Sequence, residues 1–170
     1  GSSFRMGAVA KGAGMIHPNM ATMFCFVTTD AAVDPAFLDE ALRRSVDVSF
    51  NMISIDGDMS TNDTALVPAN GLAGTEPPTG GTPGADAFER ALAEICIRMA
   101  KAIAADGEGA TKLIEVSVEG AASERDARLA ARAVAASNLV KSAVYGSDPN
   151  WGRIACAAGY SGAALEESKL

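Results

Sequence analysis

The residue with the clearest potential for chemistry is Thr22, in the stretch HPNMATMFCFVTT (residues 17–29). A threonine hydroxyl becomes a useful nucleophile when a base takes its proton, and the threonine's own α-amino group can be that base. An α-amino group has a pKa near ~7.7–8, so it accepts protons at neutral pH. This chemistry requires the Ala21–Thr22 bond to break, through attack of the Thr22 hydroxyl on the Ala21 carbonyl. The residues alone favour a simpler interpretation, a strand-edge threonine without a chemical role.

Other catalytic or ligand-binding patterns fit the sequence poorly. A Ser-His-Asp hydrolase would have to use His17, the single histidine, and no GxSxG elbow occurs. Asp56, Asp58 and Ser60 resemble the start of a calcium loop, but Thr61 and Val67 stand where that loop needs Gly and Glu. The glycine-containing stretches KGAGM and GEGATK lack the spacing of a phosphate-binding loop. With one histidine and no CxxC pair, we predict no metal site.

Composition excludes further classes. The chain has 170 residues and a net charge of −7, which argues against binding the phosphate backbone of nucleic acids. It has no run of 18 apolar residues, so we expect no membrane-spanning helix and a cytoplasmic protein. Cys25, Cys96 and Cys156 have apolar neighbours and are odd in number. They are predicted to be buried free thiols in a reducing compartment.

The elements that must position Thr22 are predicted from periodicity. Residues 1–20 are rich in glycine and are predicted to be loop, followed by a buried strand over 23–29. Asp34-Pro35 is a typical helix start for an amphipathic helix over about 35–46. The remaining expectations are a short strand over 52–55, a surface loop over 75–86 and a long helix from Asp86 that ends at Gly107 as a left-handed cap.

The last third of the chain continues the alternation. TKLIEVSV (111–118) is the clearest strand by its alternation of apolar and polar residues. Ser123 and Asp126 predict the start of an alanine-rich helix to about Ser137. YGSDPNWGRIACAAG is interpreted as a turn and a small-residue strand, with Trp151 as a core anchor. Together these elements predict a layered α/β fold.

Four stretches connect the chain to a known family. They are KGAGMIHPNMATM (11–23), SIDGDMSTNDT (54–64), EGATK (108–112) and SNLVKSAVYGSDPNWGRI (137–154). In this order they resemble the arginine-biosynthesis bifunctional glutamate/ornithine N-acetyltransferase family, over essentially the whole chain. The resemblance implies an N-terminal-nucleophile-like fold with layered sheets flanked by helices.

The resemblance also implies a mechanism and its residues. A precursor cuts itself between Ala21 and Thr22, and the new amino-terminal Thr22 is the nucleophile. Lys11 matches the family's substrate-binding lysine, and Glu108 matches its substrate-binding glutamate. Thr22 takes the acetyl group of N-acetylornithine and passes it to glutamate. Taken without the family, Lys11 would be a solvated loop lysine and Glu108 an exposed loop acid.

The implied protein is larger than this chain. The family's oxyanion-hole residues lie in an upstream segment, and further substrate contacts lie beyond Leu170. We therefore expect residues 1–21 to end the upstream segment, 22–119 to form the nucleophile-bearing core, and 120–170 to begin a second lobe or continue the core. The expected partners are the small-molecule substrates and the upstream chain, in a heterotetramer of two chain pairs, without nucleic acid or membrane. No cofactor is implied, although some family members use acetyl-CoA as an additional donor.

Two other hypotheses stay open at this point. A related self-processing aminopeptidase or amidohydrolase would use the same nucleophile but pass the acyl group to water. Alternatively, the chain is an inactive structural part of the longer enzyme that binds its partner chain.

Overall fold

The computed structural model describes residues 3–17 and 23–166. In chain order the elements are β1 (Met6–Lys11), β2 (Phe24–Thr29), α1 (Pro35–Asp47), the 3₁₀ helix η1 (Phe50–Met52), β3 (Thr64–Leu66), α2 (Pro83–Ala105), α3 (Glu124–Ala136), α4 (Asn138–Tyr145) and α5 (Trp151–Gly159). The chain is thus a mixed α/β protein, as the sequence predicts.

The three strands form one sheet in the order β1-β2-β3. β1 runs antiparallel to β2 and brings Lys11 opposite Phe24, whereas β2 runs parallel to β3 and brings Phe24 opposite Thr64. The expected strand over 23–29 is therefore confirmed as the central strand. It carries the residues that follow Thr22 into the middle of the sheet.

The expectation of loop over residues 1–20 is wrong for Met6–Lys11. This segment alternates half-buried Met6, Ala8 and Ala10 with exposed Gly7, Val9 and Lys11, so it has the period of two that a strand requires. The alternation is hard to see in the sequence because the inward residues are mostly alanines and one outward residue is a glycine. Pairing with β2 supplies the hydrogen bonds that make it a strand.

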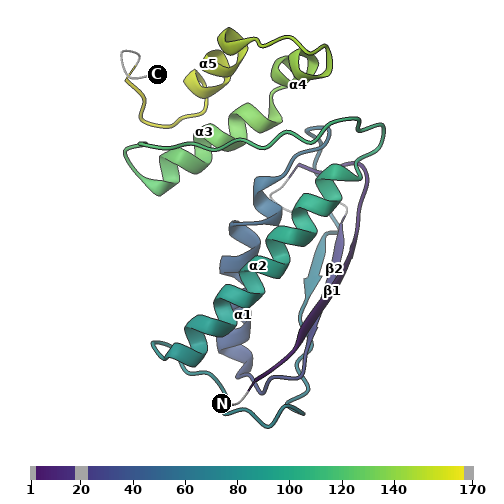
Figure 1. Ribbon diagram of the computed structural model, residues 1–170, viewed down its shortest axis with the longest axis vertical. Helices are drawn as coiled ribbons and strands as arrows, with labels where there is room; N and C mark the ends of the chain where they lie inside the picture. Colours follow the sequence, from purple (N-terminus) through teal and green to yellow (C-terminus); the bar gives the residue numbers. More distant parts are fainter. Residues whose placement is uncertain (1–2, 18–22, 167–170) are drawn as a thin grey trace.

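Two helices cover one face of the sheet (Figure 1). α1 begins where predicted, because the Asp34 carboxylate accepts the N–H groups of Ala36 and Phe37 and Pro35 occupies the first turn. α2 buries Phe88, Leu92 and Cys96 against the sheet. The buried core between these layers comprises Ile16, Met23, Cys25, Val27, Ala31, Ala41, Phe50, Phe88, Leu92, Cys96, Ala100 and Ile103.

α3, α4 and α5 form a second group of helices at one end of the sheet layer (Figure 1). They enclose a smaller core of Val134, Val140, Ala157 and Ala158. α3 starts as predicted, with the Ser123 hydroxyl accepting the N–H of Asp126. The division of the chain at residues 21/22 and 119/120 stays a prediction.

The expected strand over 52–55 is wrong. Phe50–Met52 form a 3₁₀ turn, and the Ser49 hydroxyl donates to the Ser45 carbonyl to continue the end of α1. β3 instead begins at Thr64, after the polar run, and takes the place beside β2.

The segment 111–118 keeps its predicted alternation but is not a strand. Ile114, Val116 and Val118 are half-buried while Leu113, Glu115 and Ser117 are exposed. In the part of the chain that the structure describes, no strand lies beside this segment to complete a ladder. The alternation shows that successive side chains face the protein interior and the solvent in turn, but a strand also needs a neighbouring strand as its hydrogen-bonding partner.

The expected strand within 145–159 is also wrong, because Trp151–Gly159 form α5. The Asn150 side chain accepts the N–H of Arg153 and caps the helix. The small residues that suggested a strand include three alanines, which favour helix. Trp151 is 80% exposed and so is not a core anchor, and Cys156 is exposed.

The long helix ends close to its predicted position but with a different cap. α2 runs over Pro83–Ala105, and Gly109 rather than Gly107 has the left-handed backbone, with φ of 70°. Gly107 is needed for space instead, because a Cβ there would lie 3.1 Å from two carbons of Ile55. This contact packs the end of α2 against the 53–55 segment.

The face of the sheet opposite the helices is apolar and open. Val9, Phe26 and Leu66 lie in register across the three strands and are 66%, 43% and 47% exposed. We call these three residues the outer row. Lys11 and Phe24 lie on the same face, two register pairs further along.

Candidate active site

The end of β1 places a lysine over an aromatic ring. The Lys11 Nζ lies 5.2 Å from the centre of the Phe24 ring, a cation–π geometry. Among the described residues, Lys11 has no carboxylate within ion-pair distance. The ammonium is therefore held at the edge of the sheet with its charge available to an anion. Ala21 and Thr22, predicted as the self-cleavage site and nucleophile, lie outside the described residues.

Met23, the first described residue after Thr22, has both its backbone N–H and its backbone carbonyl in hydrogen bonds. The Met23 N–H donates to Asp63 Oδ1 at 2.5 Å, and the Met23 carbonyl accepts the N–H of Thr64 at 3.0 Å. The Met23 side chain is buried in the core. The start of β3 thus anchors the start of β2 at Met23.

A glycine turn after Lys11 brings Glu108 into the same region. The Glu108 N–H donates to the Ala13 carbonyl at 2.7 Å. A Cβ added to Gly14 would lie 3.3 Å from Glu108 Oε2 and 3.6 Å from Asp56 Oδ2, so both carboxylates pack against this glycine. Glu108 is exposed and, like Lys11, forms no ion pair within the described ranges.

Asp56 stabilises the turn that leads towards residue 18. Its carboxylate accepts the N–H groups of Met15 at 2.5 Å, Ile16 at 3.1 Å and Asp58 at 3.0 Å. Partial burial acts to raise the pKa of Asp56, but these backbone donors outweigh it and lower the pKa below its usual value. Met15 has a left-handed backbone with φ of 56°. The carboxylate therefore compensates a locally unfavourable conformation.

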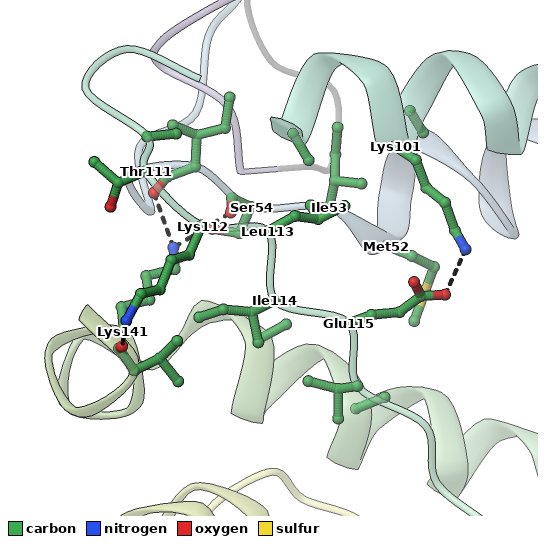
Figure 2. A pocket seen from close by; sticks show the side chains of 18 of the residues that line it. Met52, Ile53, Ser54, Lys101, Thr111, Lys112, Leu113, Ile114, Glu115 and Lys141 are labelled. Carbon is green, nitrogen blue, oxygen red and sulfur yellow. Dashed lines mark hydrogen bonds and ion pairs between the residues drawn. The ribbon is translucent and has the colours of Figure 1, made fainter. Parts of the chain in front are cut away.

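His17 and Lys141 attach the second helical group to this turn. His17 Nδ1 lies 3.0 Å from Ser54 Oγ, while Lys141 Nζ donates to the carbonyls of Ser54 and Ile55 at 3.3 and 2.9 Å. Figure 2 shows Lys141 beside Ser54, reaching from the helical group to this loop. Burial lowers the pKa of Lys141, and burial together with Arg132 and Lys141 lowers the pKa of His17. His17 is thus a structural contact of the loop, mainly neutral at pH 7.

A cavity of about 460 Å³ includes Glu108 in its lining. Its walls come from the 53–55 segment, the end of α2, the 108–116 segment, α3 and α4. Figure 2 shows Ile114 between a Lys101–Glu115 ion pair on one side and Lys112 and Lys141 on the other. Lys112 donates to the carbonyls of Val144 and Tyr145, so both of these lysines are occupied by backbone contacts.

The structure therefore places Lys11 at the end of β1 and Glu108 against the glycine turn that follows it, and their substrate-binding roles stay predictions. Sequence reasoning missed the supporting Asp56, Asp63 and Lys141. Asp56 and Asp63 both belong to the run DGDMSTNDT (56–64). The available signal was its concentration of aspartates without a neighbouring lysine or arginine.

Two features are absent from the described residues. No group of three or more His, Cys, Asp or Glu residues in the described ranges is arranged to hold a metal ion. Within the same ranges, no helix has both the length and the apolar character needed to cross a membrane.

The buried thiols Cys25 and Cys96 are not nucleophiles of this site. Burial raises the pKa of Cys25 to about 11, and burial together with Cys25 raises the pKa of Cys96 to about 12. Both sulfurs are therefore protonated at neutral pH and act as core side chains.

Comparison with known proteins defines first the class and then the family. The fold is of the N-terminal-nucleophile type: it matches, with a TM-score of 0.81 and 51% identity, a crystal structure of the arginine biosynthesis bifunctional protein ArgJ from Bacillus halodurans. The match covers 84% of this chain and 67% of that one. A model of the ArgJ family matches residues 1–170, and the chain belongs to this family.

Curated relatives carry the same description. Proteins named arginine biosynthesis bifunctional protein ArgJ from Symbiobacterium thermophilum and Geobacter sulfurreducens are 62% and 56% identical, over 100% and 99% of this chain. The chain spans only 42% and 43% of their lengths.

Proposed function

We propose that this chain is the nucleophile-bearing part of an enzyme that transfers an acetyl group from N-acetylornithine to glutamate in arginine biosynthesis. The supporting observation is that Lys11 precedes and Glu108 packs against one glycine turn, neither of them in an ion pair within the described residues, beside the strand that follows Thr22. Both proposed substrates are amino acids, which present a carboxylate to a lysine. The relatives named as ArgJ proteins support the same assignment.

The first proposed step is self-cleavage. The Thr22 hydroxyl attacks the Ala21 carbonyl and forms an ester while the Thr22 nitrogen takes up a proton. Water then hydrolyses the ester, which leaves a carboxylate on Ala21 and a free amino group on Thr22. The fixed Met23 peptide supports this step, because it holds the chain immediately after the reacting residue.

The second step is acetyl transfer by double displacement. The free amino group takes the hydroxyl proton as Thr22 Oγ attacks the acetyl carbonyl of N-acetylornithine. The tetrahedral intermediate collapses, the Thr22 ammonium protonates the leaving amine, and ornithine departs. The amine of glutamate then attacks the acetyl-threonine ester, and N-acetylglutamate leaves. In this scheme Lys11 binds the α-carboxylate, and Glu108 binds the distal ammonium of ornithine or positions an amine.

The partners and location follow as part of the same proposal. A further part of the precursor would cover the outer row, which β1 of the upstream chain shares with β2 and β3 and which is too apolar to favour contact with water. We further propose a heterotetramer of two such chain pairs, cytoplasmic, with no bound cofactor and acetyl-CoA as an additional acetyl donor.

The test uses the full-length precursor and its Thr22→Ala variant. We expect the wild type to yield a chain that begins at Thr22 and, with N-acetylornithine, gains one acetyl group on that residue. The variant should stay uncut and unacetylated. Mass spectrometry of intact chains and peptides reads out both results, and acetylation of any other side chain during turnover would refute the assignment. Loss of the acetyl group to water at the same rate with and without glutamate would indicate the aminopeptidase or amidohydrolase alternative.

A further inference from the structure

Residues 111–118 form a long stretch without helix or strand between the end of α2 and the start of α3 (Figure 1). Every second side chain, those of Ile114, Val116 and Val118, is half-buried, and the side chains between them are exposed. Successive side chains point to opposite sides in this way when the backbone is extended. The segment therefore has the form of a β-strand that lacks a neighbouring strand.

The backbone of this segment makes no hydrogen bond to the rest of the described chain. From Thr111 to Val118, no N–H donates and no carbonyl accepts within residues 3–17 and 23–166, and the hydrogen bonds of the segment come from its side chains. Backbone N–H and carbonyl groups need partners, and a row of unpaired ones along an extended segment is a template for another strand.

Side chains already hold the segment in its extended form. The Lys112 ammonium donates to the last two carbonyls of α4, at 2.5 and 3.2 Å. Glu115 forms an ion pair with Lys101 of α2 (Figure 2). Val116 packs against the smaller core of the second helical group. Because the segment is tied to both groups of helices, pairing with another strand would cost it little further conformational entropy.

The pattern of unpaired groups indicates what kind of partner fits. Donors and acceptors that alternate along an extended backbone are matched by a second extended backbone, whereas a helix uses its own backbone groups internally. Two ArgJ relatives match 100% and 99% of this chain, but the chain spans only 42% and 43% of their lengths. Each of these relatives therefore has more than half of its length outside the matched region from which a strand can come.

We propose that residues 111–118 pair, as a β-strand, with an extended segment of the same precursor that lies outside residues 1–170. This inference rests on the proposed function, in which the chain is one part of a longer enzyme. The pairing would also fix the position of Glu108, because only Gly109 and Ala110 separate it from the segment and Gly109 has a left-handed backbone with φ of 70°. Substrate binding by Glu108 would thus depend on a strand from another part of the enzyme.

Hydrogen exchange of the full-length, self-cleaved enzyme tests the pairing. In a ladder on one side of a strand, every second N–H donates to the neighbour. We expect alternate amides of 111–118, or all of them if strands pair on both sides, to exchange more than about tenfold more slowly than in an unstructured peptide. The amides of Thr79, Gly80 and Gly81 also lack partners in the described residues and, as a surface-loop control, should exchange freely. Free exchange of every amide in 111–118 would overturn the inference.

A photo-cross-link identifies the partner. Directly opposed side chains of paired strands lie about 4.5–5.5 Å apart, so p-benzoylphenylalanine in place of the exposed Ser117 should label a precursor peptide outside residues 1–170. The same group in place of the exposed Leu72 is the control and should not label that peptide. A cross-link from position 117 to residues 111–118 of a second molecule would show pairing between copies and overturn the inference. Acetyl-Thr22 is measured in the same preparation, and its absence alone would overturn the proposed acetyl transfer but not the strand pairing.

Discussion

The Asp56 carboxylate offers a quantitative test of how the site's turn is held. In Asp56→Asn, an NH₂ group would face the Met15 N–H if the amide oxygen keeps the Ile16 and Asp58 donors. One charge-assisted bond is lost, worth about 1.5–3 kcal/mol when fully protected. Because Asp56 is exposed, water replaces part of it, and we expect a loss of about 1 kcal/mol.

Hydrogen exchange measures this loss locally. A reduction of about 1 kcal/mol in local opening free energy should speed exchange of the Met15 and Ile16 amides about fivefold. Self-cleavage of the full-length precursor should also slow, because the same turn leads towards Ala21. Asp58→Asn is the control, since only the backbone N–H of Asp58 takes part in the network.

The pH dependence of the same variant has a defined sign. The pKa of Asp56 is lowered in the folded protein, so the stabilisation by its charge is present above the unfolded value of about 3.9 and is lost as the pH falls through the folded value. The ratio of exchange rates between variant and wild type should therefore approach one in acid. Equal exchange at neutral pH, with normal self-cleavage, would refute the claim that Asp56 holds this turn.

Three further perturbations test other contacts. Gly14→Ala places a Cβ 3.3 Å from Glu108 Oε2 and should raise KM for N-acetylornithine several-fold with kcat little changed. Gly159→Ala is the control and should leave KM unchanged, because a Cβ there meets nothing within 4 Å. Lys141→Met removes both hydrogen bonds to the 54–55 carbonyls and should lower the free energy of unfolding by about 1 kcal/mol in denaturant titrations. An unchanged free energy of unfolding would show that these two bonds do not stabilise the protein. Phe26→Asp places a charge on the outer row and should lower the denaturant concentration at which the two chains of the cut protein separate; because the β1–β2 ladder already joins them, an unchanged midpoint would show that nothing further covers this face.

Two helix starts were predicted reliably from the sequence. Asp34-Pro35 and Ser123 marked the starts of α1 and α3 correctly, because a helix cap uses residues within one turn of each other. Strand predictions depended on partners elsewhere in the chain. The alternation of 111–118 is real but unpaired among the described residues, while β1 was missed although it pairs along its whole length.

Secondary structure was mispredicted where the residue types in a stretch are common in more than one kind of element. Alanine and glycine occur in tight strands, in loops and in helices, so YGSDPNWGRIACAAG and the first twenty residues each admitted more than one interpretation. The deciding contacts were the Asn150 cap of α5 and the register of β1 with β2. Trp151 was predicted to be a core anchor, but it lies at the exposed start of α5.

Some residues of the candidate site can be recognised from their type, whereas others can be recognised only from the backbone groups that they contact. Lys11 and Glu108 could be assigned because a binding charge is visible as a residue type once the family resemblance supplies its position. Asp56 and Asp63 act on the N–H groups of Met15 and Met23, at separations of 41 and 40 residues. Every non-proline residue carries such an N–H, so nothing in the sequence marks which one a distant aspartate will hold. The supporting acids of a site built on backbone donors therefore become identifiable only when the fold brings the two segments together.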